Sequence, residues 1–160
     1  MKEWMKFKVN GVTYDEEIDH RRTLLEMLRE NLGLLGTHKG CDEGQCGCCT
    51  VLVDGKAVNS CIVLAADVQG KHITTIEGLA QGEELHPVQK AFVETGAIQC
   101  GFCTPGMIMA AKAFLDKNPN PTEEEAKMAI SGNLCRCTGY FQIIEAVMKA
   151  AEEMRREVKA

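Results

Sequence analysis

The chain has 160 residues, a formal net charge of −5, 45% hydrophobic residues and 26% charged residues. This composition is typical of a soluble globular protein, and the acidic balance argues against nucleic-acid binding, which needs a basic surface. No stretch approaches the ~18 consecutive apolar residues of a membrane-spanning helix, and the first ten residues lack the apolar core of a secretory signal. We therefore expect a cytoplasmic protein of one or two small domains with no membrane span.

The first half of the chain has the short apolar period of β-strands. Asn10-Gly11 lies between two alternating runs and predicts a tight hairpin. Asp54-Gly55 predicts a second hairpin, between Thr50–Val53 and Lys56–Cys61. Ile73–Ile76 is expected to form a further short strand.

Helices are expected in one segment of the first half and in four segments of the second half. Thr23 and Glu26 have the spacing of a capping box, which predicts a helix that runs from Thr23 to a stop at Gly33. The four later helices are expected at Pro87–Thr95, after a cap at Thr104, from Thr122 to Gly132, and from about Tyr140.

The period changes from strand to helix near Gly78–His86. The segment before this change combines strands, one helix and a cysteine-rich loop, which indicates a small α+β domain. Four short helices with brief connections after it indicate a small bundle. We therefore predict an α+β protein with two domains, residues 1–78 and residues 79–160.

Nine cysteines need an explanation in a chain without a secretory signal, where thiols stay reduced. Cys41, Cys46 and Cys49 have the spacing C-x4-C-x2-C, and Cys61 follows after eleven intervening residues. This is the ligand spacing of a plant-type 2Fe–2S cluster. Glycines near these cysteines allow the backbone to fold tightly around a cluster; they are Gly40, Gly44 and Gly47.

Two points about this first group stay open on the residues alone. Four cysteine thiolates also make a structural zinc site, so zinc is the serious alternative to iron. Cys48 adjoins Cys49, and the spacing selects Cys49 as the ligand. Cys48 is then a spare cysteine, which is most often a small buried apolar residue.

A second group consists of Cys100-x2-Cys103 and, after thirty-one further residues, Cys135-x-Cys137. Each pair is expected just before a helix, where the partial positive charge of the helix end favours thiolates and an anionic cluster. Two loops at one end of a bundle can hold a cluster between them. The second group therefore predicts a second 2Fe–2S centre.

Three runs of the chain resemble the small iron–sulfur subunit of the molybdenum hydroxylases. They are GCDEGQCGCCTVLVDG (Gly40–Gly55), QCGFCTPGMIM (Gln99–Met109) and GNLCRCTGY (Gly132–Tyr140). That family includes xanthine dehydrogenase, aldehyde oxidoreductase and aerobic carbon monoxide dehydrogenase. The resemblance extends from about Phe7 to Met148. Many members of the family have alanine at the position of Cys48 and lysine at the position of His38.

The resemblance implies a β-grasp, ferredoxin-like domain in residues 1–78 and a four-helix bundle domain in residues 79–160. It further implies a large partner subunit that holds a molybdenum–pterin cofactor near the second cluster. A medium subunit with FAD would commonly receive electrons from the first cluster. By the same resemblance, Gln99 and Cys137 match positions that contact the pterin.

The function expected from this resemblance is electron transfer in an oxidoreductase. Substrate would be oxidised on the large subunit, and the two clusters would relay the electrons one at a time to a flavin or another acceptor. We expect no catalytic acid, base or nucleophile in this chain, because the cofactor supplies the chemistry. The alternative is a free-standing two-cluster ferredoxin, which would be a stable monomer.

Overall fold

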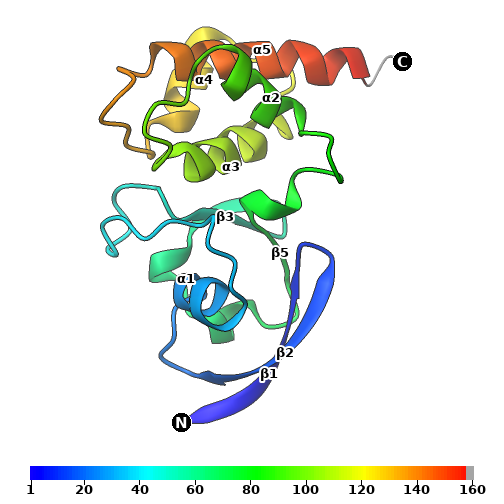
Figure 1. Ribbon diagram of the computed structural model, residues 1–160, viewed down its shortest axis with the longest axis vertical. Coiled ribbons are helices and arrows are strands. Elements are labelled where there is room, and N and C mark those ends of the chain that lie inside the picture. The colour runs from blue at the N-terminus through cyan, green and yellow to red at the C-terminus, as the bar shows by residue number, and fades with distance from the viewer. Residues whose placement is uncertain (158–160) are drawn as a thin grey trace.

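The computed structural model describes residues 1–157, which form one five-stranded sheet and five α-helices, so the protein is of mixed α/β class. The strands are β1 (Lys2–Val9), β2 (Val12–Asp19), β3 (Thr50–Val53), β4 (Lys56–Asn59) and β5 (His72–Thr74). The helices are α1 (Leu24–Glu26), α2 (Pro87–Glu94), α3 (Thr104–Leu115), α4 (Glu123–Ile130) and α5 (Phe141–Glu157). Figure 1 shows the sheet and α1 at one end of the molecule and α2 to α5 at the other.

The sheet has the order β2-β1-β5-β3-β4. β1 pairs with β5 in parallel, and the other neighbours are antiparallel. Both predicted hairpins are confirmed. Asn10 and Gly11 have φ of 51° and 81°, and Asp54 and Gly55 have φ of 48° and 75°, as a two-residue turn that follows the twist of its strands requires.

The helix predicted from Thr23 begins as expected but is shorter and less regular. The Glu26 N–H donates to the Thr23 hydroxyl (3.2 Å), and the Thr23 N–H donates to the Glu26 carboxylate (3.0 Å), which completes the capping box. After Glu26 the chain widens into a π-helical turn, η1 (Met27–Asn31), closed by the bond from the Leu32 N–H to the Met27 carbonyl. The segment ends before Gly33, whose φ is 68°.

Helices α2 to α5 surround one apolar core, and α2 contacts α3 and α5 while α4 also contacts both α3 and α5. The capping box at Thr122 is confirmed. The cap predicted for Thr104 is wrong by one residue, because Cys103 is the residue that precedes the first turn of α3. Tyr140 takes a left-handed conformation (φ 70°), so α5 begins one residue later, at Phe141.

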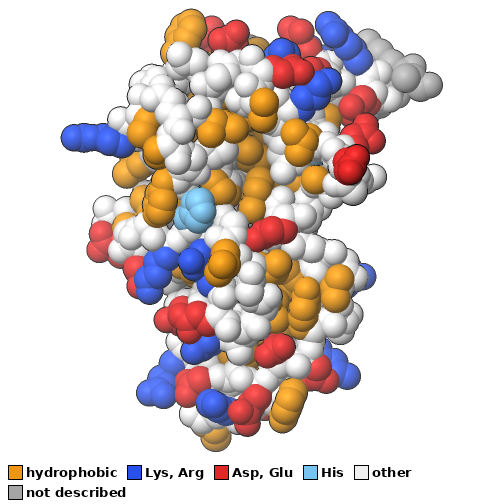
Figure 2. Space-filling model, in the orientation of Figure 1, with side chains coloured by type: hydrophobic (Ala, Val, Ile, Leu, Met, Phe, Trp, Pro, Cys, Tyr) orange, Lys and Arg blue, Asp and Glu red, His pale blue; other side chains and the backbone are white. Residues whose placement is uncertain are grey.

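The sheet and α1 enclose a second core, and the two cores meet at β3. Leu52 of β3 belongs to the helical core, and α3 lies directly against β3 and β4. In Figure 2 charged side chains are frequent at the lower end, where β1 begins, near the end of α5 and at mid-height on the left, and many apolar side chains are exposed around the middle of the molecule. No helix within residues 1–157 combines the length and the apolarity needed to cross a membrane.

Candidate metal centres

The loop between α1 and β3 directs backbone N–H groups at a thiol. The Glu43, Gln45 and Cys46 N–H groups lie 3.5, 3.3 and 3.3 Å from the Cys41 sulfur. Hydrogen bonds from these groups, led by Glu43 and Cys46, lower the pKa of Cys41 to about 7. The Cys41 N–H in turn donates to the Cys46 sulfur at 3.3 Å. The loop therefore favours a thiolate at Cys41, which lies beside Cys46.

Cys49 and Cys61 form the inner part of the same group. Both are buried beside Leu25. Cys49 immediately precedes β3, and Cys61 lies in the 3-10 turn η2 (Ser60–Ile62) that follows β4. Burial, followed by contact with the Cys49 thiol, raises the pKa of Cys61 to about 12. A buried thiol of this kind becomes a thiolate when a bound cation compensates its charge.

The second group is assembled from the loop before α3 and the loop before α5. The Cys137 thiol lies 3.5 Å from the Cys100 sulfur, and both side chains are exposed. The Phe102 N–H, together with the Cys137 thiol, lowers the pKa of Cys100. Cys100 and Cys137 therefore form a solvent-facing pair.

Cys103 and Cys135 form the second, half-buried pair of this group. Burial, with contact from the Cys135 side chain, raises the pKa of Cys103 to about 12. Burial opposes ionisation of Cys135 as well, but the Thr138 hydroxyl, 3.2 Å from its sulfur, and nearby N–H groups bring the pKa of Cys135 below its ordinary value. The Tyr140 hydroxyl accepts a hydrogen bond from the Cys135 N–H at 2.9 Å and holds this turn in place.

Each group of four thus consists of two close pairs. A 2Fe–2S cluster takes four cysteines shared between two irons, so this pairing fits such a cluster. A single tetrahedral zinc ion would instead need its ligands gathered about one point. Within residues 1–157 no three His, Cys, Asp or Glu side chains are placed to hold a single metal ion. The arrangement of the thiols in pairs agrees with binuclear clusters.

Cys48 lies outside both groups of pairs. Its side chain is buried near the Cys46 thiol, and burial raises the pKa of Cys48 to about 12. A side chain at Gly40 would meet the Cys46 sulfur at 2.7 Å and the Cys48 sulfur at 3.6 Å, which explains why glycine precedes Cys41. The structure therefore gives Cys48 the surroundings of a packed apolar residue.

The two cysteine loops touch each other, which the sequence did not reveal. The Leu134 N–H donates to the Cys46 carbonyl at 2.8 Å. The His38 ring stacks on that of Phe102 (5.0 Å between centroids), and His38 Nδ1 lies 2.7 Å from the Phe102 carbonyl oxygen. Asn133 is buried and bonds to the first loop. In the sequence these residues are marked only by their position near cysteines, and that position does not reveal which residues they contact.

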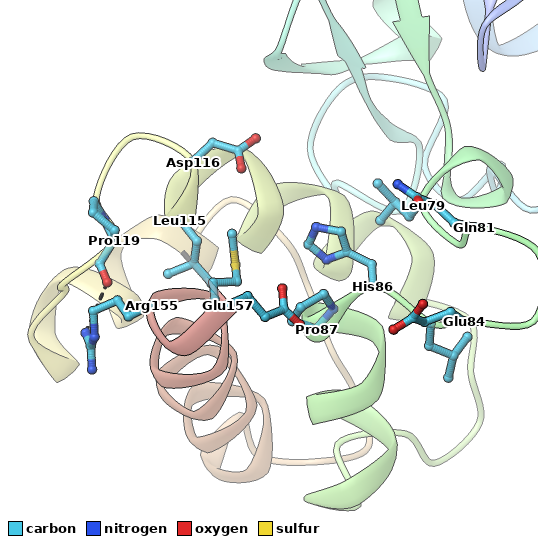
Figure 3. Close-up of a pocket in the computed structure, with 12 residues that line it drawn as sticks. Leu79, Gln81, Glu84, His86, Pro87, Leu115, Asp116, Pro119, Arg155 and Glu157 are labelled. Carbon is cyan, nitrogen blue, oxygen red and sulfur yellow. Dashed lines mark hydrogen bonds between the residues drawn. The ribbon is translucent and has the colours of Figure 1, made fainter. Parts of the chain in front are cut away.

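Gln99, predicted by resemblance to contact a pterin, is exposed next to the exposed Cys100. A separate cavity of about 770 Å³ lies beside the segment that links the two halves (Figure 3). Its walls include His86, Asp116 and Arg155 but no cysteine. Both groups of cysteines therefore lie outside this cavity.

Comparisons with known proteins agree with this geometry. Residues 7–80 match the family described as "2Fe-2S iron-sulfur cluster binding domain", and residues 75–148 match the "[2Fe-2S] binding domain". The chain is 47% identical over 148 residues to the "Nicotinate dehydrogenase small FeS subunit" of Eubacterium barkeri, covering 92% of this chain and 94% of the relative. It is 50% identical over 143 residues to the "Nicotine 6-hydroxylase small subunit" of Paenarthrobacter nicotinovorans, covering 89% and 86%.

Among solved structures, a chain of quinoline 2-oxidoreductase from Pseudomonas putida 86 superposes with a TM-score of 0.93 at 44% identity, covering 97% of each chain. The aldehyde oxidoreductase from Desulfovibrio desulfuricans ATCC 27774 also has a TM-score of 0.93, at 42% identity, but this chain covers 17% of that longer one. The same fold thus occurs both as a separate subunit and as one part of a larger chain.

The fold and the paired thiols define an iron–sulfur protein with two 2Fe–2S binding domains. The chain belongs to the family of small iron–sulfur subunits of the molybdenum hydroxylases. It carries two 2Fe–2S clusters and serves as the electron-transfer subunit of an oxidoreductase complex. The free-standing ferredoxin considered from the sequence is not favoured, because the relatives are named as subunits.

Proposed function

We propose that electrons enter this chain at the second group and leave it from the first. The ligands would be Cys100, Cys103, Cys135 and Cys137 for the entry cluster, and Cys41, Cys46, Cys49 and Cys61 for the exit cluster. Each cluster, when bound, takes up and releases one electron at a time. The chain itself supplies the thiolates, the N–H groups that stabilise their charge, and the fixed distance between the two centres.

The observation that carries this direction is the difference in exposure within the second group. Cys100 and Cys137 face solvent, and Cys103 and Cys135 face the rest of the chain. A donor on another subunit can therefore approach the outer pair, while the inner pair lies toward the first group. By resemblance, Gln99 and Cys137 would contact a pterin cofactor on that donor subunit.

Apolar side chains flank the outer pair in the sequence and support a docked partner there. Phe102 and Leu134 are about half exposed, and Phe141, at the start of α5, is 74% exposed. Exposed aromatic and aliphatic side chains next to a functional centre are typical of protein interfaces. We assign this surface to a large molybdenum–pterin subunit and propose that a medium FAD-binding subunit receives electrons from the first group.

Within this proposal the two halves are distinct domains. Residues 1–78 would form a β-grasp, ferredoxin-like domain, in accord with the mixed sheet and α1. Residues 79–160, of which 158–160 lie outside the described part of the chain, would form a four-helix bundle domain. Iron–sulfur ligation by cysteines suits the cytoplasm, where thiols stay reduced, and we place the complex there.

The test is the content of iron, acid-labile sulfide and zinc in the complex purified from its native source without oxygen. We expect about four irons and four sulfides per chain, as two 2Fe–2S clusters require. Cys41→Ser and Cys100→Ser are each expected to remove about half of both. Stoichiometric zinc without sulfide would refute the electron-transfer function, and a monomer that holds all the iron would refute the docked partner.

A further inference from the structure

The two cysteine loops are joined by one backbone hydrogen bond. The Leu134 N–H donates to the Cys46 carbonyl at 2.8 Å. Cys46 belongs to the first group, and Leu134 immediately precedes Cys135 of the second group. A path from one set of thiols to the other thus runs along the backbone of Cys46, across this hydrogen bond, and through Leu134 to Cys135.

Asn133 fixes the geometry of the contact between the two loops, which is formed by Cys46 and Gly47 on one side and Asn133 and Leu134 on the other and is called the crossing below. Its side chain is 6% exposed, and its Nδ2 donates to the Gly47 carbonyl at 2.9 Å and to the Thr50 hydroxyl at 3.2 Å. Its own N–H donates to the Ile130 carbonyl at the end of α4, at 2.9 Å. Asn133 is therefore anchored to the helical half by its backbone and to the first cysteine loop by its side chain.

The crossing is also too tight to admit a side chain. Gly47 has a φ of 71°, and a Cβ there would lie 2.6 Å from Asn133 Nδ2 and from the Gly132 carbonyl oxygen. The Thr50 hydroxyl donates to the same Gly47 carbonyl at 2.7 Å. The Thr50 N–H donates to it as well, at 3.1 Å. The Gly47 carbonyl thus receives three hydrogen bonds, two from Thr50 at the start of β3 and one from Asn133, which leaves the loop little freedom to move away.

We propose that Asn133 is a positioning residue for electron transfer between the two clusters. By holding the first loop against the second, it maintains the bond between the Leu134 N–H and the Cys46 carbonyl. One electron leaves the second centre, which is oxidised by one unit, and enters the first, which is reduced by one unit. No covalent bond forms or breaks, and no proton moves. This role rests on the proposed function, in which both centres hold clusters.

The carboxamide suits this position for a chemical reason. Its NH2 supplies two donors from one nitrogen, and the buried acceptors, the Gly47 carbonyl and the Thr50 hydroxyl, take both. An alanine at this position leaves the Gly47 carbonyl with one donor fewer in a dry site, which weakens the contact between the loops. Leucine keeps the volume of the side chain but also lacks the donors.

The chain offers a matched control at Asn59. Its Nδ2 donates to the Gly44 carbonyl of the same cysteine loop at 2.8 Å, and its Oδ1 lies 3.4 Å from the Thr50 hydroxyl. Asn59 belongs to β4, so its bonds stay within the sheet half and do not reach the second loop. Asn59→Ala removes a carboxamide donor from the first loop and a 3.4 Å contact from the Thr50 hydroxyl, but it leaves every hydrogen bond made by Asn133 in place.

The experiment compares the wild-type complex with Asn133→Ala, Asn133→Leu and Asn59→Ala, and the iron and sulfide content of each is measured first. The rate at which an electron injected by flash photoreduction equilibrates between the clusters is recorded. The spin–spin splitting in the electron paramagnetic resonance spectrum of the dithionite-reduced complex is recorded as well. Hydrogen exchange of the peptide that contains the Leu134 amide provides a readout that needs no turnover.

In both Asn133 variants we expect slower equilibration, a reduced splitting, and roughly tenfold faster exchange at Leu134. Asn59→Ala is expected to leave all three unchanged. Unchanged rate and splitting in a fully loaded Asn133 variant would overturn the proposal, as would equal losses in Asn59→Ala. Iron lost from both Asn133 variants but not from Asn59→Ala would also overturn it. Asn133 would then be needed for the binding of the clusters rather than for electron transfer between them. A wild-type complex without iron would instead refute the proposed function.

Discussion

Cys48 and Cys49 are adjacent in the chain, but their surroundings differ. Cys49 contacts the Cys61 thiol, and Cys48 packs beside Cys46 away from the pairs. We predict that Cys48→Ala keeps the full iron and sulfide content, and that Cys49→Ala loses about half of both. Chemical analysis of the two purified variants checks this prediction. Loss of iron from Cys48→Ala would mean that Cys48, and not Cys49, is the ligand.

At the scale of single residues, the spacing predicted which cysteines lie together, because one short loop brings Cys41 and Cys46 side by side. That the grouped cysteines are the cluster ligands stays a prediction. The contacts of Asn133, His38 and Phe102 could not be predicted in this way. Each joins segments far apart in the sequence: Asn133 lies beside Gly47, and His38 lies beside Phe102. Such contacts depend on how two folded halves meet, and no local pattern encodes that meeting.

Helix α3 approaches the first cysteine loop more closely than any side chain would permit. A Cβ at Gly106 would overlap the Gly47 carbonyl oxygen and lie 3.0 Å from the Cys48 Cα, and both are backbone atoms that cannot move aside cheaply. We predict that Gly106→Ala lowers the free energy of unfolding by about 1–3 kcal/mol, the usual cost of overpacking. Urea unfolding of the holoprotein measures this change.

Gly132→Ala is the control for this effect. Nothing lies within 4 Å of a Cβ at Gly132, and its φ is not in the left-handed region. This variant is expected to change stability by about 0.5 kcal/mol or less, as surface substitutions do. Equal destabilisation by the two variants would mean that flexibility, and not the contact between α3 and the loop, explains the loss at Gly106.

At the scale of elements, the sequence predicted hairpins and capped helices well because their determinants are local. The Asn10-Gly11 turn and the capping boxes at Thr23 and Thr122 formed as expected. The π-helical turn Met27–Asn31 did not follow from the apolar period. Met27 and Leu28 are fully buried there, so packing under the sheet overrides the regular helix.

At the scale of the whole molecule, the proposed interface at the second group can be tested with a surface substitution that leaves the fold intact. Phe141, which follows Cys137 by four residues, is 74% exposed, and Trp4 is 67% exposed on β1 in the sheet half. We predict that Phe141→Ser weakens binding to the large subunit roughly tenfold or more, as loss of an aromatic anchor does, with iron content unchanged. Affinity measured between the separately purified subunits tests this.

Trp4→Ser removes an aromatic side chain of similar exposure away from the proposed interface, and it is expected to leave the affinity unchanged. If Trp4→Ser weakens the complex and Phe141→Ser does not, the large subunit docks on the sheet half. The direction of electron flow proposed for the two centres would then be reversed.

The hydrogen bonds at the Cys46 and Gly47 carbonyls have a consequence for biogenesis. Both acceptors lie in the N-terminal half, and both donors, Leu134 and Asn133, are translated some ninety residues later. During synthesis the N-terminal half leaves the ribosome first. Its cysteine loop then lacks two hydrogen-bond donors, the Leu134 N–H and the Asn133 side chain, until the helical half has folded. We therefore expect insertion of the first cluster to follow completion of the whole chain.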